Sequence, residues 1–274
     1  MNIRTALAQG ADLLLEARIP EPRLTAEVLL AHATHHDRTY FYAHPEQDLR
    51  EVEWLHYGRY LHERMQGKPT QYITKRQEFY GREFTVSRDV LIPRPETELL
   101  VETVLKLRRA PGVIIDIGTG SGAIAITLAL ELQCPVIATD LSHEALAIAR
   151  SNAVRLGANV SFIEADLFKS FAGGIADIVV SNPPYVPLTV RESLQREVRD
   201  WEPSIALFGG SSGTAIYERI IPEARRVLKP GGLLALELGF GQSEAVTALA
   251  RDWRDVQVFP DLAGIPRVLV CKQP

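Results

Sequence analysis

The sequence predicts an α/β fold: a mostly parallel seven-stranded sheet, preceded by a small helical domain and a β-hairpin linker. Two observations indicate this fold. Helical hydrophobic periodicity dominates up to about residue 67, whereas short β-rich segments alternate with helical segments after residue 111. The length of 274 residues also favours one large and one small domain. We expect the helical domain over residues 1–70, the linker over residues 71–95 and the α/β domain over residues 96–274.

The composition is that of an ordinary globular chain, with 46% hydrophobic and 23% charged residues and a formal net charge of −4. Proteins that follow duplex nucleic acid usually carry a basic surface, and the overall charge balance indicates none. Cys134 and Cys271 are isolated, so we expect two buried, reduced thiols rather than a disulfide or zinc site. No apolar run approaches the roughly 18 residues of a membrane span, and the N-terminal segment, whose helical pattern is broken by Asp12 and Glu16, does not have the pattern of a signal peptide. We therefore expect a cytoplasmic location.

The N-terminal segment is predicted to form helices. Apolar residues recur at helical spacing in three stretches: Ile3, Leu7, Leu14 and Leu15; Leu24, Val28, Leu29 and Leu30; and Val52, Leu55, Leu61 and Met65. Histidines concentrate in the same segment, and His32 and His36 are spaced to share a helix face. Since no acidic or cysteine ligand pattern accompanies them, we interpret them as a solvated face and expect no metal site.

A change of pattern marks the linker. Gly81 separates two alternating aromatic runs between residues 78 and 86, which predicts a hairpin. The segment Ile92-Pro-Arg-Pro-Glu-Thr-Glu98 follows, and its prolines prevent a helix before one begins near Glu96. Arg94 and Glu98 either close over an active site or form a surface ion pair at the start of this helix.

The α/β domain is predicted from seven β-rich segments. They are Val113–Ile117, Val136–Thr139, Val160–Glu164, Ile178–Val180, Leu233–Leu238, Val256–Phe259 and Val268–Lys272. Helical patterns over Ala123–Leu132 and Glu144–Leu156 separate the first three, with Ser142 as the N-cap of the second helix. Such alternation implies right-handed crossovers and parallel strands. The last two segments are joined without a helix, so we expect an antiparallel final strand.

A glycine-rich turn, Gly118-Thr119-Gly120-Ser121-Gly122, joins the first strand to the first helix. Glycines allow a sharp turn and a close approach of the main chain to a ligand, and ligands bind at the carboxyl ends of such strands. A tight turn without a ligand is the alternative. The dinucleotide pattern is G-x-G-x-x-G, whereas here the third glycine comes one residue early. The compact turn therefore favours the sulfonium amino acid of S-adenosylmethionine over a pyrophosphate.

Acidic residues end the next two strands. Asp140 can accept hydrogen bonds from two ribose hydroxyls, although an aspartate there can also cap the following helix. Asp166 and Phe168 follow the third strand, where they could bond the adenine amino group and stack on the ring. For Phe168 the alternative is a position in the core. Since these residues follow successive strands, we predict that they line one cofactor site.

The fourth strand leads into Asn182-Pro183-Pro184-Tyr185. A rigid exit turn is the simplest interpretation, but the residue types suit a planar NH₂ group, whose nitrogen is a poor nucleophile. The Asn182 side-chain oxygen and a proline carbonyl could accept its two N–H groups, and Tyr185 offers a flat face. We therefore predict catalytic roles for Asn182, Pro183 and Tyr185, and substrate binding by all four residues.

With these motifs in place, the chain resembles the HemK/PrmC family of protein-(glutamine-N5) methyltransferases, which modify peptide chain release factors. The similarity covers nearly the whole chain. It rests on Gly67–Ile73, Glu78–Gly81, Leu91–Glu98, Asp116–Ala125, Val180–Val186, Glu197–Pro203, Ala206–Gly210, Leu228–Gly232 and Asp261–Gly264. One departure is Lys75, where the family more often has glycine. The combination of Ile92–Glu98 with Asn-Pro-Pro-Tyr is specific to the family.

The resemblance implies a Rossmann-like class I methyltransferase fold and S-adenosylmethionine as cofactor. It implies that Gly118–Gly122, Asp140, Phe168 and Asn182 line the cofactor pocket. It also implies that Asn182–Tyr185 hold the glutamine of the Gly-Gly-Gln loop of class I release factors, in translation termination. By the same analogy the helical domain and the hairpin would help to grip that protein.

Two other functions remain open. A DNA adenine-N6 methyltransferase could use Asn-Pro-Pro-Tyr on a base amino group, but it must flip its base and usually has a dedicated recognition region. The absence of a net basic excess favours a protein substrate over nucleic acid. A non-catalytic cofactor-binding module would predict damage to the glycine turn or to Asn182, and both are intact.

Overall fold

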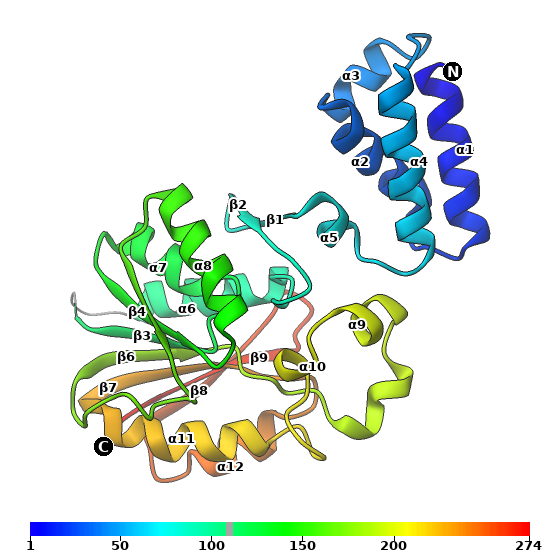
Figure 1. Ribbon diagram of the computed structural model, residues 1–274. Coiled ribbons are helices and arrows are strands. Elements are labelled where there is room, and N and C mark those ends of the chain that lie inside the picture. Colours follow the sequence, from blue (N-terminus) through cyan, green and yellow to red (C-terminus); the bar gives the residue numbers. More distant parts are fainter. Residues whose placement is uncertain (108–111) are drawn as a thin grey trace. The chain divides into compact units, whose positions relative to one another are not determined.

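The computed structural model describes residues 1–107 and 112–274, which divide into two compact units (Figure 1). The first unit consists of residues 1–76 and 195–201, and the second of residues 77–194 and 202–274. The boundaries therefore differ from the predicted ones. Most of the expected linker belongs to the second unit, and a short segment from late in the sequence belongs to the first.

The first unit is helical. Its elements are α1 (Ile3–Glu16), α2 (Pro22–Thr34), α3 (Arg38–Ala43), α4 (Glu51–Met65), α5 (Thr70–Thr74) and α9 (Arg196–Trp201). Asn2 caps α1 by accepting a hydrogen bond from the Thr5 amide at 2.9 Å. Buried residues of α1, α2 and α4 form its core, among them Leu7, Leu29 and Tyr57. The three predicted helices are therefore present, whereas α3, α5 and α9 were not predicted.

Not every apolar residue of the predicted stripes faces this core. Leu15 and Leu55 are exposed, at 63% and 62%, and α4 buries Tyr57 together with the predicted Leu61, four residues apart on one helix face. The expected pairing of His32 with His36 is also wrong. Helix α2 ends at Thr34, and His36 stacks on Tyr40 with ring centroids 3.8 Å apart.

The predicted hairpin is confirmed. Its strands β1 (Arg76–Phe79) and β2 (Arg82–Thr85) flank the two-residue turn Tyr80-Gly81, whose φ angles are 53° and 68°. Two successive positive φ angles characterise the turns that match strand twist, and glycine adopts the second without strain. The main-chain amide of Tyr80 donates to Glu98 Oε1 at 2.7 Å. Glu98 thus holds the hairpin and does not pair with Arg94.

The second unit contains the predicted seven-stranded sheet. Its strands are β3 (Ile114–Ile117), β4 (Val136–Asp140), β5 (Val160–Glu164), β6 (Ala176–Ser181), β7 (Leu228–Glu237), β8 (Arg254–Pro260) and β9 (Pro266–Lys272). Its helices are α6 (Pro95–Leu107), α7 (Ala123–Leu132), α8 (His143–Leu156), η1 (Leu188–Ser193), α10 (Ser204–Leu207), α11 (Ala215–Val227) and α12 (Ser243–Leu249). Ser142 caps α8, as predicted, by accepting from the Ala145 amide at 3.1 Å.

The strand order is β5-β4-β3-β6-β7-β9-β8. Strands β3 to β7 pair in parallel, whereas β9 lies between β7 and β8 and is antiparallel to both. This confirms the antiparallel last strand. Because β3 has β4 on one side and β6 on the other, the chain reverses its direction of winding at β3. Ligands of such sheets bind beside this point, at the carboxyl ends of the strands.

Helices cover both faces of the sheet: α6, α7 and α8 lie on one side and α11 and α12 on the other (Figure 1). Alternate residues of the strands supply the two cores. Ile114 and Val180 pack in the first core with Leu100 of α6, whereas Ile115 and Val179 pack in the second with α11. Continuous apolar strands are expected of a parallel sheet covered on both faces. The two cores fix the strand ends that carry the site.

Candidate functional site

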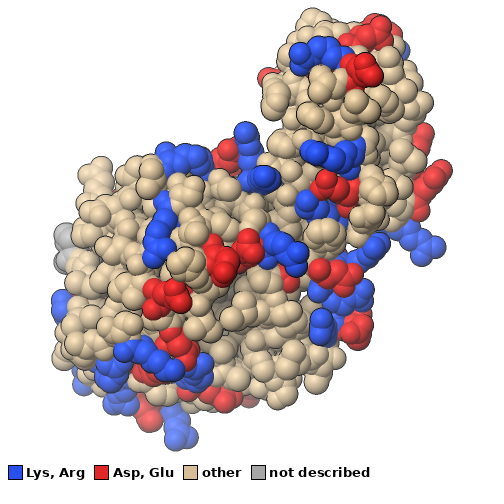
Figure 2. Space-filling view, viewed as in Figure 1, with Lys and Arg blue, Asp and Glu red and all other residues tan. Residues whose placement is uncertain are grey.

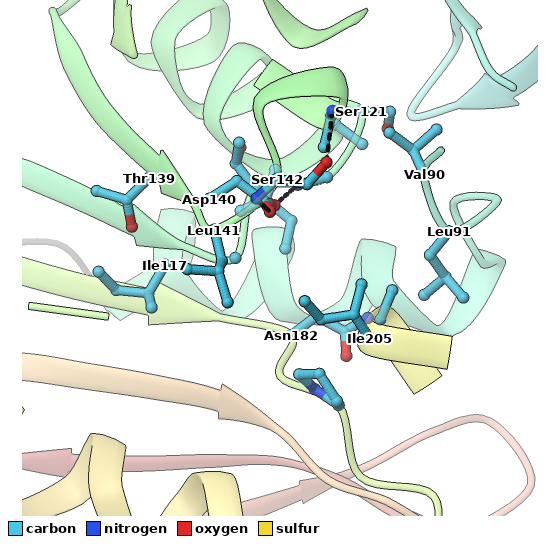
Figure 3. Close-up of a pocket in the computed structure, with 18 of the residues that line it drawn as sticks. Val90, Leu91, Ile117, Ser121, Thr139, Asp140, Leu141, Ser142, Asn182 and Ile205 are labelled. Carbon is cyan, nitrogen blue, oxygen red and sulfur yellow. Dashed lines mark hydrogen bonds between the residues drawn. The ribbon is translucent and has the colours of Figure 1, made fainter. Parts of the chain in front are cut away.

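A cavity opens at the carboxyl ends of β3, β4 and β6, within the second unit (Figure 3). Space unfilled by protein atoms amounts to about 1100 Å³, open mouth included. Figure 3 shows Asp140 and Ser142 on one side of it, Val90 and Leu91 on another, and Asn182 and Ile205 on a third. The cavity therefore lies where the strand ends were predicted to bring their polar residues together.

The glycine turn forms one wall of this cavity. Gly118 and Gly120 line it with φ angles of 73° and 56°, and a Cβ added to either would meet no atom within 4 Å. The amides of Gly118 and Thr119 donate to the Thr139 carbonyl at 2.9 and 2.8 Å, which fixes the turn against β4. Thr119 and Ser121 also line the cavity. The turn thus leaves room at its main chain for a ligand to approach.

Gly122, in contrast, does not line the cavity. Its φ is 84°, and an added Cβ would lie 2.8 Å from Ile126 Cδ1 and 3.2 Å from Ala149 Cβ. Glycine is required here because α7 begins close to α8. The third glycine of the turn therefore serves helix packing rather than the predicted cofactor contact.

Asp140 lies at the tip of β4 and lines the cavity. Its Oδ2 accepts from the Gly120 amide at 2.8 Å and its Oδ1 from the Ser142 amide at 2.9 Å. Burial raises the pKa of this carboxyl, and these amide hydrogen bonds oppose the rise. Since each carboxylate oxygen has a second lone pair, Asp140 can still accept two hydrogen bonds from a ligand.

The tip of β5 departs from the prediction. Asp166 lines the cavity and forms ion pairs with Lys169 and Arg219, each at 2.7 Å, which lower its pKa. Phe168 is fully buried in the core that includes Ile115, and it does not line the cavity. The core alternative is therefore the correct one for Phe168. The apolar residue that lines the cavity is Leu167, whose φ of 53° turns the chain there.

The Asn-Pro-Pro-Tyr motif follows directly after β6. Ser181 Oγ donates to the Ile117 carbonyl at 2.6 Å and so ties this strand end to β3. Asn182 and Pro184 line the cavity. The Asn182 amide nitrogen donates to Thr97 Oγ1 at 3.1 Å, and its oxygen makes no hydrogen bond among the described residues. The predicted acceptor oxygen is thus available at the cavity.

The remaining two motif residues lie elsewhere. Pro183 is buried, and neither Pro183 nor Tyr185 lines the cavity. Tyr185 is half-buried; its hydroxyl donates to Glu237 Oε1 at 3.3 Å, and its carbonyl accepts from Gln242 Nε2 at 2.8 Å. The structure therefore gives Tyr185 protein contacts rather than the predicted place in the cavity wall.

A buried acid at the end of β7 was not predicted. Glu237 has 2% of its surface exposed, and burial raises its pKa to about 7, although hydrogen bonds from Thr97 and Tyr185 oppose the rise. Asp116 at β3 is comparable: burial raises its pKa to about 7, while Thr119 Oγ1 donates to its Oδ2 at 2.6 Å. The only sequence signal for Glu237 was a charge within the apolar run from residue 233 to residue 238.

Sequence analysis also missed the segment before α6 as part of the cavity. Val90, Leu91 and Arg94 of this segment line it, as does Thr97 in the first turn of α6, whereas the sequence analysis named only Arg94 and Glu98 as residues that could close over an active site. Arg94 pairs with buried Glu202 at 2.5 Å, so the alternative of a surface ion pair with Glu98 is wrong, and closure over the active site stays a prediction. The two prolines at residues 93 and 95 were the signal that this segment is rigid.

Asn152 joins the hairpin to the glycine turn. This buried residue of α8 accepts from the Thr85 amide at 2.8 Å and donates to the carbonyls of Thr85 and Ser121 at 3.0 and 2.9 Å. Three main-chain groups therefore depend on one side chain.

Across residues 1–107 and 112–274, no three His, Cys, Asp or Glu side chains gather as a metal site would require, and no helix combines the length and hydrophobicity of a membrane span.

Comparison with known proteins identifies the family of this chain. Residues 5–74 match the PrmC N-terminal domain, and residues 95–196 match the methyltransferase small domain. The release factor glutamine methyltransferase of Koribacter versatilis is 45% identical over 100% of this chain and 99% of that protein. Similarity of this extent includes both units.

Two solved structures show the same fold as the second unit. The hMettl16 catalytic domain in complex with the MAT2A 3′UTR hairpin 6 is 17% identical, with a TM-score of 0.59 over 75% of this chain and 80% of that chain. The E. cuniculi Mtq2–Trm112 complex, responsible for the methylation of the eRF1 translation termination factor, is 22% identical, with a TM-score of 0.51 over 68% of this chain and 99% of that chain. The fold is that of class I methyltransferases, and with its matches over the full length the chain belongs to the release factor glutamine methyltransferase family, also called HemK/PrmC.

Proposed function

We propose that this chain transfers a methyl group from S-adenosyl-L-methionine to the side-chain amide N5 of the glutamine in the Gly-Gly-Gln motif of class I peptide chain release factors. The observation that carries the proposal is the shared cavity. It places Asn182, at the tip of β6, in the same cavity as the glycine turn of β3 and Asp140 of β4. When bound, S-adenosylmethionine supplies a methyl group on a positively charged sulfur.

The lining residues fit this cofactor. Open space beside Gly118 and Gly120 would admit its amino acid part, since no side chain lies there. Asp140 would accept from the two ribose hydroxyls with the lone pairs that Gly120 and Ser142 leave free. At the tip of β5, Asp166 and Leu167 would contact the adenine, which moves the predicted apolar contact from Phe168 to Leu167.

Asn182 would bind the acceptor amide. Its side-chain oxygen and a proline carbonyl of the motif would accept the two N–H groups of the glutamine, as the sequence predicts. This arrangement would direct the nitrogen lone pair toward the methyl carbon, and the attacking nitrogen would release its proton after transfer. Positioning of this kind lowers a barrier by several kcal/mol, up to about 7–11 in the best intramolecular reactions. Tyr185 would contribute by stiffening the motif rather than by stacking on the amide.

The charge distribution supports a protein substrate. On the face shown in Figure 2, basic and acidic side chains are interspersed. The net charge of −4 adds no attraction for a phosphate backbone. The exposed apolar side chains of the first unit, including Leu15, Tyr42 and Leu55, offer contacts for a protein. We therefore assign this unit to binding of the release factor, and expect both proteins to meet in the cytoplasm.

The test is methyl transfer to a purified class I release factor and, in parallel, to duplex DNA. Mass spectrometry should map one added methyl group to the glutamine of the Gly-Gly-Gln motif, and a factor with alanine at that glutamine should remain unmodified. Asn182→Ala should abolish transfer while S-adenosylhomocysteine still binds. Methylated DNA with an unmodified factor would overturn the substrate assignment, and a chain that binds no S-adenosylhomocysteine would overturn the cofactor assignment.

A further inference from the structure

A buried polar network connects the acceptor motif to α6 and β7. Asn182 Nδ2 donates to Thr97 Oγ1 at 3.1 Å, the Tyr185 hydroxyl donates to Glu237 Oε1 at 3.3 Å, and the neighbouring Thr97 side chain lowers the pKa of the Glu237 carboxyl. Thr97 and Glu237 are 4% and 2% exposed. The family's acceptor motif does not include either residue. Asn182, Thr97 and Glu237 come from separate elements, so only the folded second unit brings them together.

The polarity of this network determines which end of the Asn182 amide faces the cavity. An asparagine amide has a donor end and an acceptor end of nearly the same shape, so its partners select the orientation. Thr97 has one hydroxyl proton, and the neighbouring buried Glu237 carboxyl, whose Oε2 lacks a donor among the described residues, can accept it. Once that proton is donated, Thr97 Oγ1 can only accept. It therefore selects the nitrogen of Asn182 and leaves the oxygen at the cavity.

Glu237 is suited to impose this polarity because an ionised carboxylate can only accept. Its Oε1 accepts from the Tyr185 hydroxyl at 3.3 Å, and the buried Oε2 has no partner at normal hydrogen-bond distance in the described part of the chain. A buried acceptor without a donor is costly, which favours the nearby Thr97 hydroxyl. The Tyr217 hydroxyl is already used, since it donates to the Glu237 main-chain carbonyl at 2.7 Å.

We propose that Glu237 and Thr97 are positioning residues that hold the Asn182 amide with its oxygen toward the cavity. This inference rests on the proposed function, in which that oxygen accepts an N–H group of the substrate amide. With the orientation reversed, Asn182 would present N–H groups to the N–H groups of the substrate, and the acceptor nitrogen would lose its alignment. Neither residue needs to contact the cofactor for this role.

The decisive variant is Thr97→Val, which keeps the side-chain shape and removes the hydroxyl. The Asn182 nitrogen then loses its buried hydrogen-bond acceptor. The free-energy cost of one unsatisfied buried group therefore favours the reversed amide about ten- to a hundredfold. We expect kcat for release-factor methylation to fall by that factor at pH 8.5, where a carboxyl with a pKa of about 7 is ionised. The Kd for S-adenosylhomocysteine should stay within about twofold, and Thr97→Ser, which restores the hydroxyl, should recover most of kcat.

Thr103→Val is the matched control. Thr103 lies on the same helix, is 3% exposed, and its hydroxyl donates to the Leu99 carbonyl at 2.7 Å. This variant exchanges a buried hydroxyl for a methyl group without touching the network, so kcat should not change. A loss of kcat in Thr103→Val as large as in Thr97→Val would show a general packing effect and overturn the positioning role.

A second variant tests Glu237 itself. In Glu237→Gln the new amide can donate to Thr97 Oγ1, which frees the Thr97 proton for the Asn182 oxygen and reverses the network. We expect kcat to fall, and the double variant with Thr97→Val to be no slower than Thr97→Val alone, because both act through one orientation. Additive losses, or a wild-type kcat in Thr97→Val, would refute the proposal. If the wild-type chain itself fails to methylate the release factor, the proposed function fails instead.

Discussion

Glu237 should make the stability of the second unit depend on pH. Its pKa is about 7 in the folded chain against an ordinary value of 4.5, so the folded state binds the proton more tightly than the unfolded state does. Between these two pH values the folded carboxyl stays protonated while the unfolded one ionises. The contribution of Glu237 is therefore fully present below pH 4.5, and it is lost as the pH rises to about 7.

The size of the effect follows from the difference of about 2.5 pKa units. At about 1.4 kcal/mol for each unit, Glu237 should remove about 3 kcal/mol from the free energy of unfolding across this range. Glu237→Gln cannot ionise and should lack this loss. The difference in unfolding free energy between variant and wild type should therefore shift by about 3 kcal/mol in favour of the variant between pH 4.5 and pH 8.5. Asp116, whose pKa is also about 7, contributes equally to both proteins and cancels.

Denaturant unfolding, followed by the fluorescence of Trp253, measures this difference. Trp253 is buried in the second unit, and replacing Trp54 and Trp201 with phenylalanine leaves it as the only tryptophan signal. Glu244→Gln, on the exposed side of α12, is the control for the loss of a carboxyl outside the core. A Glu237→Gln difference that stays constant to within about 0.5 kcal/mol from pH 4.5 to 8.5 would refute a raised pKa for this buried acid.

Three further variants test other parts of the site. Asp140→Ala should raise the Kd for S-adenosylhomocysteine about a hundredfold by calorimetry, because two hydrogen bonds to a charged acceptor are lost; an unchanged Kd would remove Asp140 from the ribose. Asn152→Ala should lower the free energy of unfolding by about 3 kcal/mol, since three main-chain groups lose a partner, and hydrogen exchange at the Thr85 amide should accelerate. Protection equal to wild type would contradict that role. Gly122→Ala should lower the melting temperature through its φ of 84° and the 2.8 Å approach to Ile126, at a cost of about 2 kcal/mol; a melting temperature equal to that of the wild type would show that α7 can shift.

The fold was largely predictable because a covered parallel sheet needs continuous apolar strands. All seven predicted segments are strands, and α7 spans the predicted residues 123–132. Helix α11 was missed because Pro222 interrupts an otherwise amphipathic pattern. In α4 the predicted residues Val52 and Leu55 are exposed, since tertiary packing buries Tyr57 beside the predicted Leu61.

The candidate site was predicted where it depends on strand ends and missed where it depends on packing. The rule that ligands bind at carboxyl ends of parallel strands located Gly118, Gly120, Asp140 and Asn182 at the cavity. This rule could not tell which of Leu167 and Phe168 lines the cavity. The left-handed conformation of Leu167 turns the chain so that Leu167 lines the cavity and Phe168 is buried in the core. Contacts between residues far apart in sequence carry no local pattern.

The helical unit is discontinuous in sequence, which affects how it can be exchanged between relatives. Arg64, only 5% exposed, pairs at 2.5 Å with Glu197, which belongs to the separate stretch 195–201. A chimaera that grafts only residues 1–76 of one protein onto another would therefore leave a guanidinium enclosed beside a foreign α9. Exchanges of this unit should transplant both stretches as a pair, and evolutionary change in one should be matched by change in the other.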